Sequence, residues 1–66
     1  MTQAIAFTRL FNRPEGAEVL KWLRHRTLER VLMPDATDAE LRFLEGQRAL
    51  VSHILHLIQQ GQQERK

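Results

Sequence analysis

The sequence has 66 residues, of which 42% are hydrophobic and 27% charged, with a net charge of +2. This length excludes a second domain and allows only a modest core, and the composition is typical of a folded, soluble protein rather than a disordered chain. The absence of cysteine excludes disulfides and thiolate metal sites. The longest apolar runs fall far short of the roughly 20 residues that a membrane helix needs.

A first, short helix is expected over residues 3–12. Apolar side chains recur there at helical spacing, and Thr2 is placed to cap the first turn. The apolar positions are Ala4, Phe7, Leu10 and Phe11. A helix of this length is not stable alone, so we expect it to dock on the rest of the chain.

A second helix is expected over residues 14–32. Pro14 suits a first turn, where its missing N–H group is not needed, with Asn12 or Arg13 at the cap. The helix ends before Pro34, because proline disfavours helical geometry in the residue that precedes it. One broad apolar face runs along this helix, and it comprises Ala17, Leu20, Leu23, Thr27, Leu28, Val31 and Leu32.

The third helix has the clearest start signal. Thr37 and Glu40 form an S/T-x-x-E capping box, in which each side chain satisfies a free backbone N–H group. Gly61 is expected to end the helix, which predicts one helical domain over residues 1–60 and a disordered polar tail over residues 61–66. The apolar positions are Leu41, Phe43, Leu44, Leu50, Val51, Ile54, Leu55, Leu57 and Ile58.

These elements predict an all-α fold. The short connection at residues 33–36 favours an antiparallel helical hairpin of the second and third helices, with the short N-terminal helix across it in a three-helix mini-bundle. The apolar arc of the third helix spans about 200°, wider than the roughly 100° that a surface helix needs. Either the first helix covers the remainder or a second chain does. We expect a homo-oligomer, with a self-sufficient monomer as the alternative.

No arrangement of side chains predicts catalysis, a metal site or a cofactor. His53 and His56 lie three residues apart, as a metal pair would, but a third ligand would have to come from another element. Ser52 is the only serine, and its neighbour His53 points about 100° away on a helix. The three glycines form no phosphate-binding loop. The chain is therefore expected not to be an enzyme, and to bind no metal or cofactor.

Two candidate partner-binding surfaces stand out. Trp22 points away from the main apolar face of the second helix, and a tryptophan bordered by arginines such as Arg26 and Arg30 is typical of binding hot spots. The alternative is that the first helix or the end of the third helix covers Trp22. On the third helix, Gly46 is costly in a helix interior and indicates a close approach of another backbone or a kink. Gln47 falls inside the apolar arc, where a buried amide needs a partner.

Charge is divided along the chain. A basic segment over residues 21–30 precedes an acidic segment over residues 35–45, which suits head-to-tail or antiparallel association of copies. Nucleic-acid binding needs positive charge clustered on one surface. Lys21 and Arg24 fall near one edge of the second helix, and Arg26 and Arg30 near the other. Nucleic acid is therefore a weaker alternative partner, and no membrane partner is expected.

Several short motifs follow one another along the chain: Phe7-Thr8-Arg9-Leu10-Phe11, Pro14-Glu15-Gly16, Val19-Leu20 and Phe43-Leu44-Glu45-Gly46-Gln47-Arg48. Their order resembles a family of very short, uncharacterised tailed-phage proteins of the podovirus type. The resemblance runs from Phe7 to about Ile58 and is most specific in the Phe-x-Glu-Gly-Gln-Arg motif at Phe43-Leu44-Glu45-Gly46-Gln47-Arg48. It implies a phage origin and a role as a minor virion or assembly component, and it carries no catalytic residues. Residues 24–40 correspond least, so it assigns no role to the basic segment.

Together these observations predict a phage-encoded helical protein that acts through protein–protein contacts. The partner would be the chain itself or a larger virion protein, and the protein would lie in the bacterial host cytoplasm or be incorporated in the virion. A small inhibitor of a host protein is the first alternative, and a nucleic-acid-binding regulator is the second.

Overall fold

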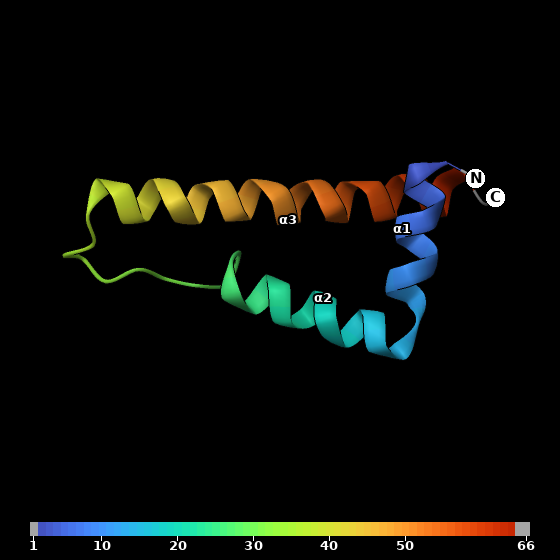
Figure 1. The fold of residues 1–66 in the computed structure, drawn as a ribbon, viewed down its shortest axis with the longest axis horizontal. Helices are drawn as coiled ribbons and strands as arrows, with labels where there is room; N and C mark the ends of the chain where they lie inside the picture. The colour runs from blue at the N-terminus through green and yellow to red at the C-terminus, as the bar shows by residue number, and fades with distance from the viewer. Residues whose placement is uncertain (1, 65–66) are drawn as a thin grey trace.

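The computed structural model describes residues 2–64, and this part of the chain is all-α, as the sequence predicts. It contains three helices, α1 (Gln3–Asn12), α2 (Pro14–Arg26) and α3 (Asp38–Glu64). Figure 1 shows α1 lying across the C-terminal end of α3, and α2 running back alongside α3 in the opposite direction. The molecule is elongated, with extents of 46 × 20 × 14 Å.

The start of α1 and the corner to α2 follow from local signals. Thr2 Oγ1 accepts a hydrogen bond from Ile5 N at 3.2 Å, which confirms the predicted cap. Arg13 has an extended backbone, as expected before proline, and Pro14 opens α2 in its first turn. Gly16 packs so tightly against the end of α1 that a Cβ there would overlap with the Leu10 carbonyl. The corner therefore requires glycine at this position.

The docking of α1 on α3 centres on small residues. Thr8 is fully buried, and its hydroxyl oxygen lies 2.9 Å from the Ala4 carbonyl oxygen and 2.9 Å from the Ile58 carbonyl oxygen, so one hydroxyl proton serves both helices. Gly61 faces this point, where a Cβ would overlap with Thr8 Oγ1 and the Ala4 carbonyl. The absence of a side chain at Gly61 lets the two helix backbones approach closely.

The prediction that Gly61 ends the third helix is wrong. Helix α3 continues through Gly61 to Glu64, so residues 61–64 are helical and not part of a disordered tail as predicted. Residues 65–66 of the predicted tail lie outside the described part of the chain. The reason is tertiary: α1 docks on this turn, and Thr2 Oγ1 donates a hydrogen bond to Glu64 Oε2 at 2.6 Å. These contacts stabilise a turn that would fray in isolation.

Helix α2 ends six residues earlier than the predicted Leu32, at Arg26. Thr27 leaves helical geometry and its hydroxyl donates a hydrogen bond to the Leu23 carbonyl at 2.7 Å. The side chain of Arg48 then donates from α3 to the carbonyls of Thr27 and Arg30. Those carbonyls are thereby satisfied without a further helical turn, and the connection to α3 is longer than predicted.

Helix α3 begins where the capping box predicts. Glu40 N donates a hydrogen bond to Thr37 Oγ1 at 3.1 Å. The buried apolar side chains of the described chain are few, and most come from α3: Ala4, Leu44, Val51 and Leu57. Val51 lines a groove together with Leu23 of α2. The core is therefore small and comes mainly from one long helix, and it does not form a closed centre.

Replacing Thr8 with valine tests the crossing of α1 and α3. Valine keeps the shape of the side chain and removes the hydroxyl, so the loss of the shared hydrogen bond should lower the free energy of unfolding by about 1 kcal/mol. Urea denaturation followed by circular dichroism measures this difference. Ser52→Ala, which removes an exposed hydroxyl from the same long helix, should change stability by less than about 0.5 kcal/mol. Equal effects of the two changes would contradict the role assigned to Thr8.

Candidate protein-binding groove

An open groove of about 290 Å³ lies between α2 and α3. It contains four of the five residues that the sequence predicted for partner binding, and these come from two surfaces that were predicted separately. The lining residues are Trp22, Leu23, Arg26, Thr27, Arg30, Phe43, Gln47, Leu50 and Val51. The antiparallel course of α2 and α3 brings the tryptophan and arginines of one helix opposite the apolar arc of the other.

The α2 side of the groove is formed by Trp22 and its arginine neighbours. The tryptophan is 58% exposed, as predicted. The guanidinium carbon of Arg26 lies 5.2 Å from the ring centroid, within cation–π range, and it comes from the next turn of the same helix. This contact fixes a flat aromatic surface and a positive charge side by side at the rim of the groove.

The α3 side carries large apolar side chains that nothing in the described chain covers. Phe43 is 70% exposed and Leu50 is 62% exposed. Gln47 lies between them, one turn from each, and it is exposed. Its amide therefore needs no partner within the chain, and the three residues form one continuous helical stripe.

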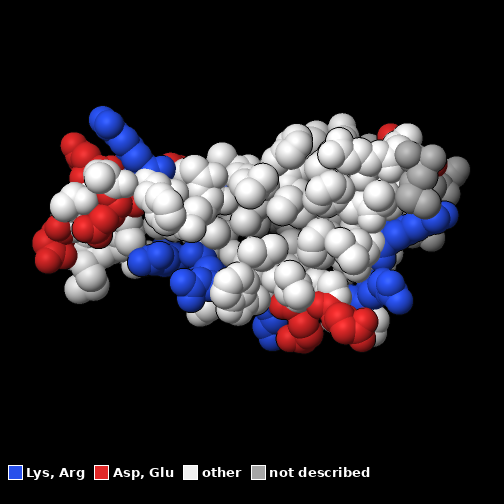
Figure 2. Space-filling model, in the orientation of Figure 1, with Lys and Arg blue, Asp and Glu red and all other residues white. Residues whose placement is uncertain are grey.

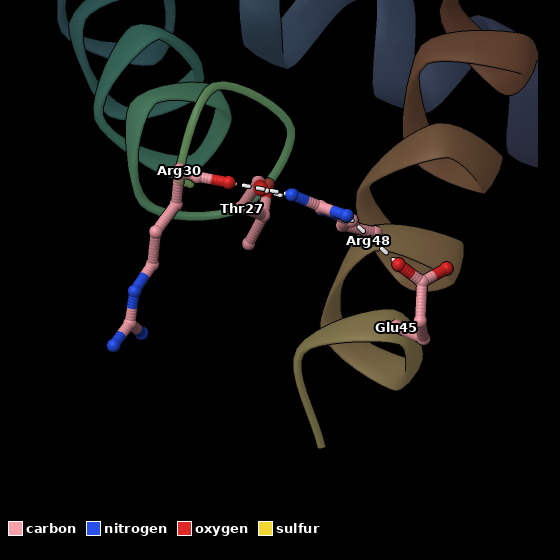
Figure 3. Close-up of polar contacts among 4 residues, drawn as sticks. All are labelled: Thr27, Arg30, Glu45 and Arg48. Carbon is pink, nitrogen blue, oxygen red and sulfur yellow. Dashed lines mark hydrogen bonds and ion pairs between the residues drawn. The ribbon is translucent and has the colours of Figure 1, made fainter. Parts of the chain in front are cut away.

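Arg48 of α3 holds the segment that follows α2, two residues of which line the groove, and the sequence analysis assigned it no role. Its Nε donates to the Thr27 carbonyl at 2.9 Å, its Nη2 to the Arg30 carbonyl at 2.5 Å, and its Nη1 to Glu45 Oε1 at 2.8 Å (Figure 3). The position of Arg48 in the sequence could have predicted this role. It falls at helical spacing between Leu44 and Val51, and an arginine inside an apolar face needs hydrogen-bond acceptors on the facing element.

Gly46 is the predicted site residue that does not line the groove. A Cβ built at this position meets nothing within 4 Å, so the close approach expected there is not made by the described part of this chain. The close approaches occur instead at Gly16 and Gly61. Gly46 lies on the outer edge of the stripe formed by Phe43 and Leu50, three residues from one and four from the other.

The stripe that Phe43, Gln47 and Leu50 form on α3 is uncharged, and charged side chains lie around it. Figure 2 shows acidic side chains gathered at the end of the molecule where α3 begins, and a broad uncharged surface over the middle of α3. In sequence, residues 49–63 contain no Asp, Glu, Lys or Arg. The basic residues of the segment 21–30 are divided as predicted: Arg26 and Arg30 line the groove, whereas Lys21 and Arg24 line a separate depression together with Glu29.

The histidines show no metal-binding arrangement. His53 and His56 are exposed, and His25 Nδ1 lies 3.7 Å from Glu29 Oε1 on the next turn of the chain. Over residues 2–64, no three side chains of the metal-ligating types come together. Within the same range, none of the helices has the length and hydropathy needed to cross a bilayer.

The comparison with known proteins agrees with the resemblance seen in the sequence. No curated protein and no solved structure matches the chain significantly. A family model does match: that of the Bbp19-like phage proteins, over residues 7–64. The match includes all of α2 and α3 and most of α1, and therefore every groove residue named above. Because it covers most of the chain, this protein belongs to the Bbp19-like phage protein family.

Proposed function

We propose that this phage protein is a protein-interaction protein, a minor virion or assembly component that binds a partner protein through the α2–α3 groove and catalyses no reaction. The observation that carries the proposal is the exposure of Trp22, Phe43 and Leu50 around one groove. Aromatic residues and arginine dominate the binding energy of protein interfaces. This groove presents aromatic residues and arginines together and is left open by the chain, so it is suited to binding a protein.

The shape of the chain supports the same conclusion. A compact domain of this length has a radius of gyration of about 11 Å, whereas this chain has 14.1 Å. An extended molecule with a thin core gains little from its own folding. Binding energy from a partner would supply what the isolated chain lacks.

Nucleic acid fits the groove less well. Its centre is apolar, its two arginines lie toward one side, and the remaining basic residues of α2 face a different depression beside Glu29. A phosphate backbone is bound by positive charge spread along one surface. A host protein, in contrast, could use the same aromatic surface, so the experiment must separate a phage partner from a host partner.

Photo-crosslinking from the groove tests the proposal. A photoreactive amino acid replaces Gln47 in cells that make the phage encoding this chain, and the adducts are identified by mass spectrometry. Gln60 is the matched control, because it is also an exposed glutamine on α3 but does not line the groove. We expect adducts from position 47 to this chain itself or to other virion or assembly proteins, and few adducts from position 60.

The other outcomes are informative as well. Adducts from position 47 to a host protein would replace the assembly role with inhibition of that host protein. Adducts to nucleic acid would favour the regulator. Similar yields from positions 47 and 60 would show that the groove is not the binding surface.

A further inference from the structure

We propose that the groove binds a second copy of this chain, with the two α3 helices packed antiparallel about a two-fold axis next to Gly46 and Gln47. The inference rests on the proposed function, in which the groove is a protein-binding surface, and it names the partner. Four features support it: the spacing of the exposed stripe, the symmetry that this spacing allows, the excess of accessible surface and the distribution of charge.

The exposed stripe on α3 belongs to a longer row of residues that has the spacing of a helix–helix seam. Phe43, Gln47, Leu50, Ile54 and Leu57 follow one another at intervals of four, three, four and three residues, which is the spacing of core positions in coiled coils. Helix α1 covers the C-terminal end of this seam, where Leu57 is only 8% exposed, while Phe43 and Leu50 at its N-terminal end stay open. The uncovered half is suited to another helix.

The same stripe is self-complementary under an antiparallel two-fold axis. An axis between positions 46 and 47 places Phe43 of each copy opposite Leu50 of the other, as an interface between identical surfaces requires. Gln47 of each copy then meets the other near the axis, where an amide can both donate and accept a hydrogen bond. Gly46 also lies at the axis, and its open Cβ position would let the two backbones approach closely.

The accessible surface of the single chain has the excess that such an interface would bury. A compact 7.8 kDa protein exposes about 4,400 Å², whereas this chain exposes 5326 Å². The difference of about 900 Å² is close to the roughly 800 Å² that each partner buries in a standard protein–protein interface. One dimer contact would therefore return the chain to the exposure expected for its size.

Charge favours the antiparallel orientation. Asp38 and Glu40 lie in the first turn of α3, and Asp35 precedes them. Parallel packing would place these carboxylates and both helix N-termini side by side, which is unfavourable. Antiparallel packing places the acidic end of one copy beside the α1 end of the other, where α3 carries no charge over residues 49–63 and α1 contributes Arg9.

Sedimentation of purified protein tests the dimer. We expect the natural chain to sediment at twice its 7.8 kDa mass at micromolar concentration, and Leu50→Glu to weaken association at least 100-fold. Leu50 is 62% exposed, so Leu50→Glu should keep its helical content by circular dichroism. Leu10→Glu is the matched control, because Leu10 is 54% exposed on α1 and lies outside the groove; it should associate like the natural chain.

Cysteine crosslinking tests the orientation, and the natural chain contains no cysteine that would interfere. Gln47→Cys should form a disulfide-linked dimer under mild oxidation, and Gln60→Cys should not. A mixture of Phe43→Cys and Leu50→Cys should form mixed dimers in preference to dimers of either variant alone. Preferential linkage of Phe43→Cys to itself would overturn the antiparallel arrangement.

A natural chain that stays monomeric at millimolar concentration would overturn the inference. The proposed function would survive that result if position 47 still crosslinks to a different protein in phage-producing cells. If neither self-association nor groove-specific crosslinking occurs, both proposals fail.

Discussion

Gly61→Ala is expected to lower the free energy of unfolding by about 1 to 3 kcal/mol, although alanine is the better helix former by about 1 kcal/mol. The added methyl group would overlap with Thr8 Oγ1 and the Ala4 carbonyl, and the latter is rigid helix backbone. Relief therefore requires α1 to move away from α3, which breaks the hydrogen bond between Thr8 and the Ile58 carbonyl. Urea denaturation measures the loss, and proteolysis near the N-terminus should become faster.

Gly46→Ala is the matched control in the same helix. A Cβ at this position meets nothing within 4 Å, so alanine should raise the free energy of unfolding by about 0.5 to 1 kcal/mol through helix propensity alone. The measurement is made at a concentration where the chain is monomeric. If the two substitutions change stability in the same direction, the close crossing of α1 and α3 at Gly61 is wrong.

Arg48→Met is expected to cost about 2 to 3 kcal/mol, because hydrogen bonds from a charged group to buried or partly buried acceptors contribute about 1.5 to 3 kcal/mol. Methionine keeps the apolar stem and removes the donors that hold the Thr27 and Arg30 carbonyls against α3. The end of α2 should then separate from α3. Hydrogen exchange should show faster exchange of the amides over residues 23–30, with little change in the α1–α3 crossing.

Glu45→Gln separates the carbonyl contacts of Arg48 from its ion pair. Glu45 is 66% exposed, and exposed ion pairs of this kind contribute about 0 to 1 kcal/mol. The substitution should leave the exchange rates over residues 23–30 unchanged. A loss of stability as large as that of Arg48→Met would show that the ion pair, and not the capture of the two carbonyls, joins α2 to α3.

Local signals in the sequence predicted the structure correctly wherever the start or end of a helix depends on residues within one turn of each other. Thr2 and Thr37 cap their helices through atoms three residues away, and Pro14 sets both the end of α1 and the start of α2. Helical periodicity likewise predicted the exposed Trp22 and the apolar stripe on α3, because spacing around a helix depends only on the helix itself. The all-α fold followed from the same signals, whereas the phage family was indicated by the resemblance of several short motifs and not by periodicity.

Only the tertiary structure decided where α2 ends, how far α3 extends and which exposed residues meet. Helix α2 ends at Arg26, and the side chain of Arg48 on α3 donates hydrogen bonds to backbone carbonyls of the residues that follow. Helix α3 continues past Gly61 because α1, from the other end of the chain, packs on it. The groove exists because α2 runs back alongside α3 (Figure 1), so that Trp22 and Gln47, from different helices, line the same groove. Each outcome depends on a contact between residues far apart in sequence, and the spacing of residues within one helix does not determine which residues of another segment they meet.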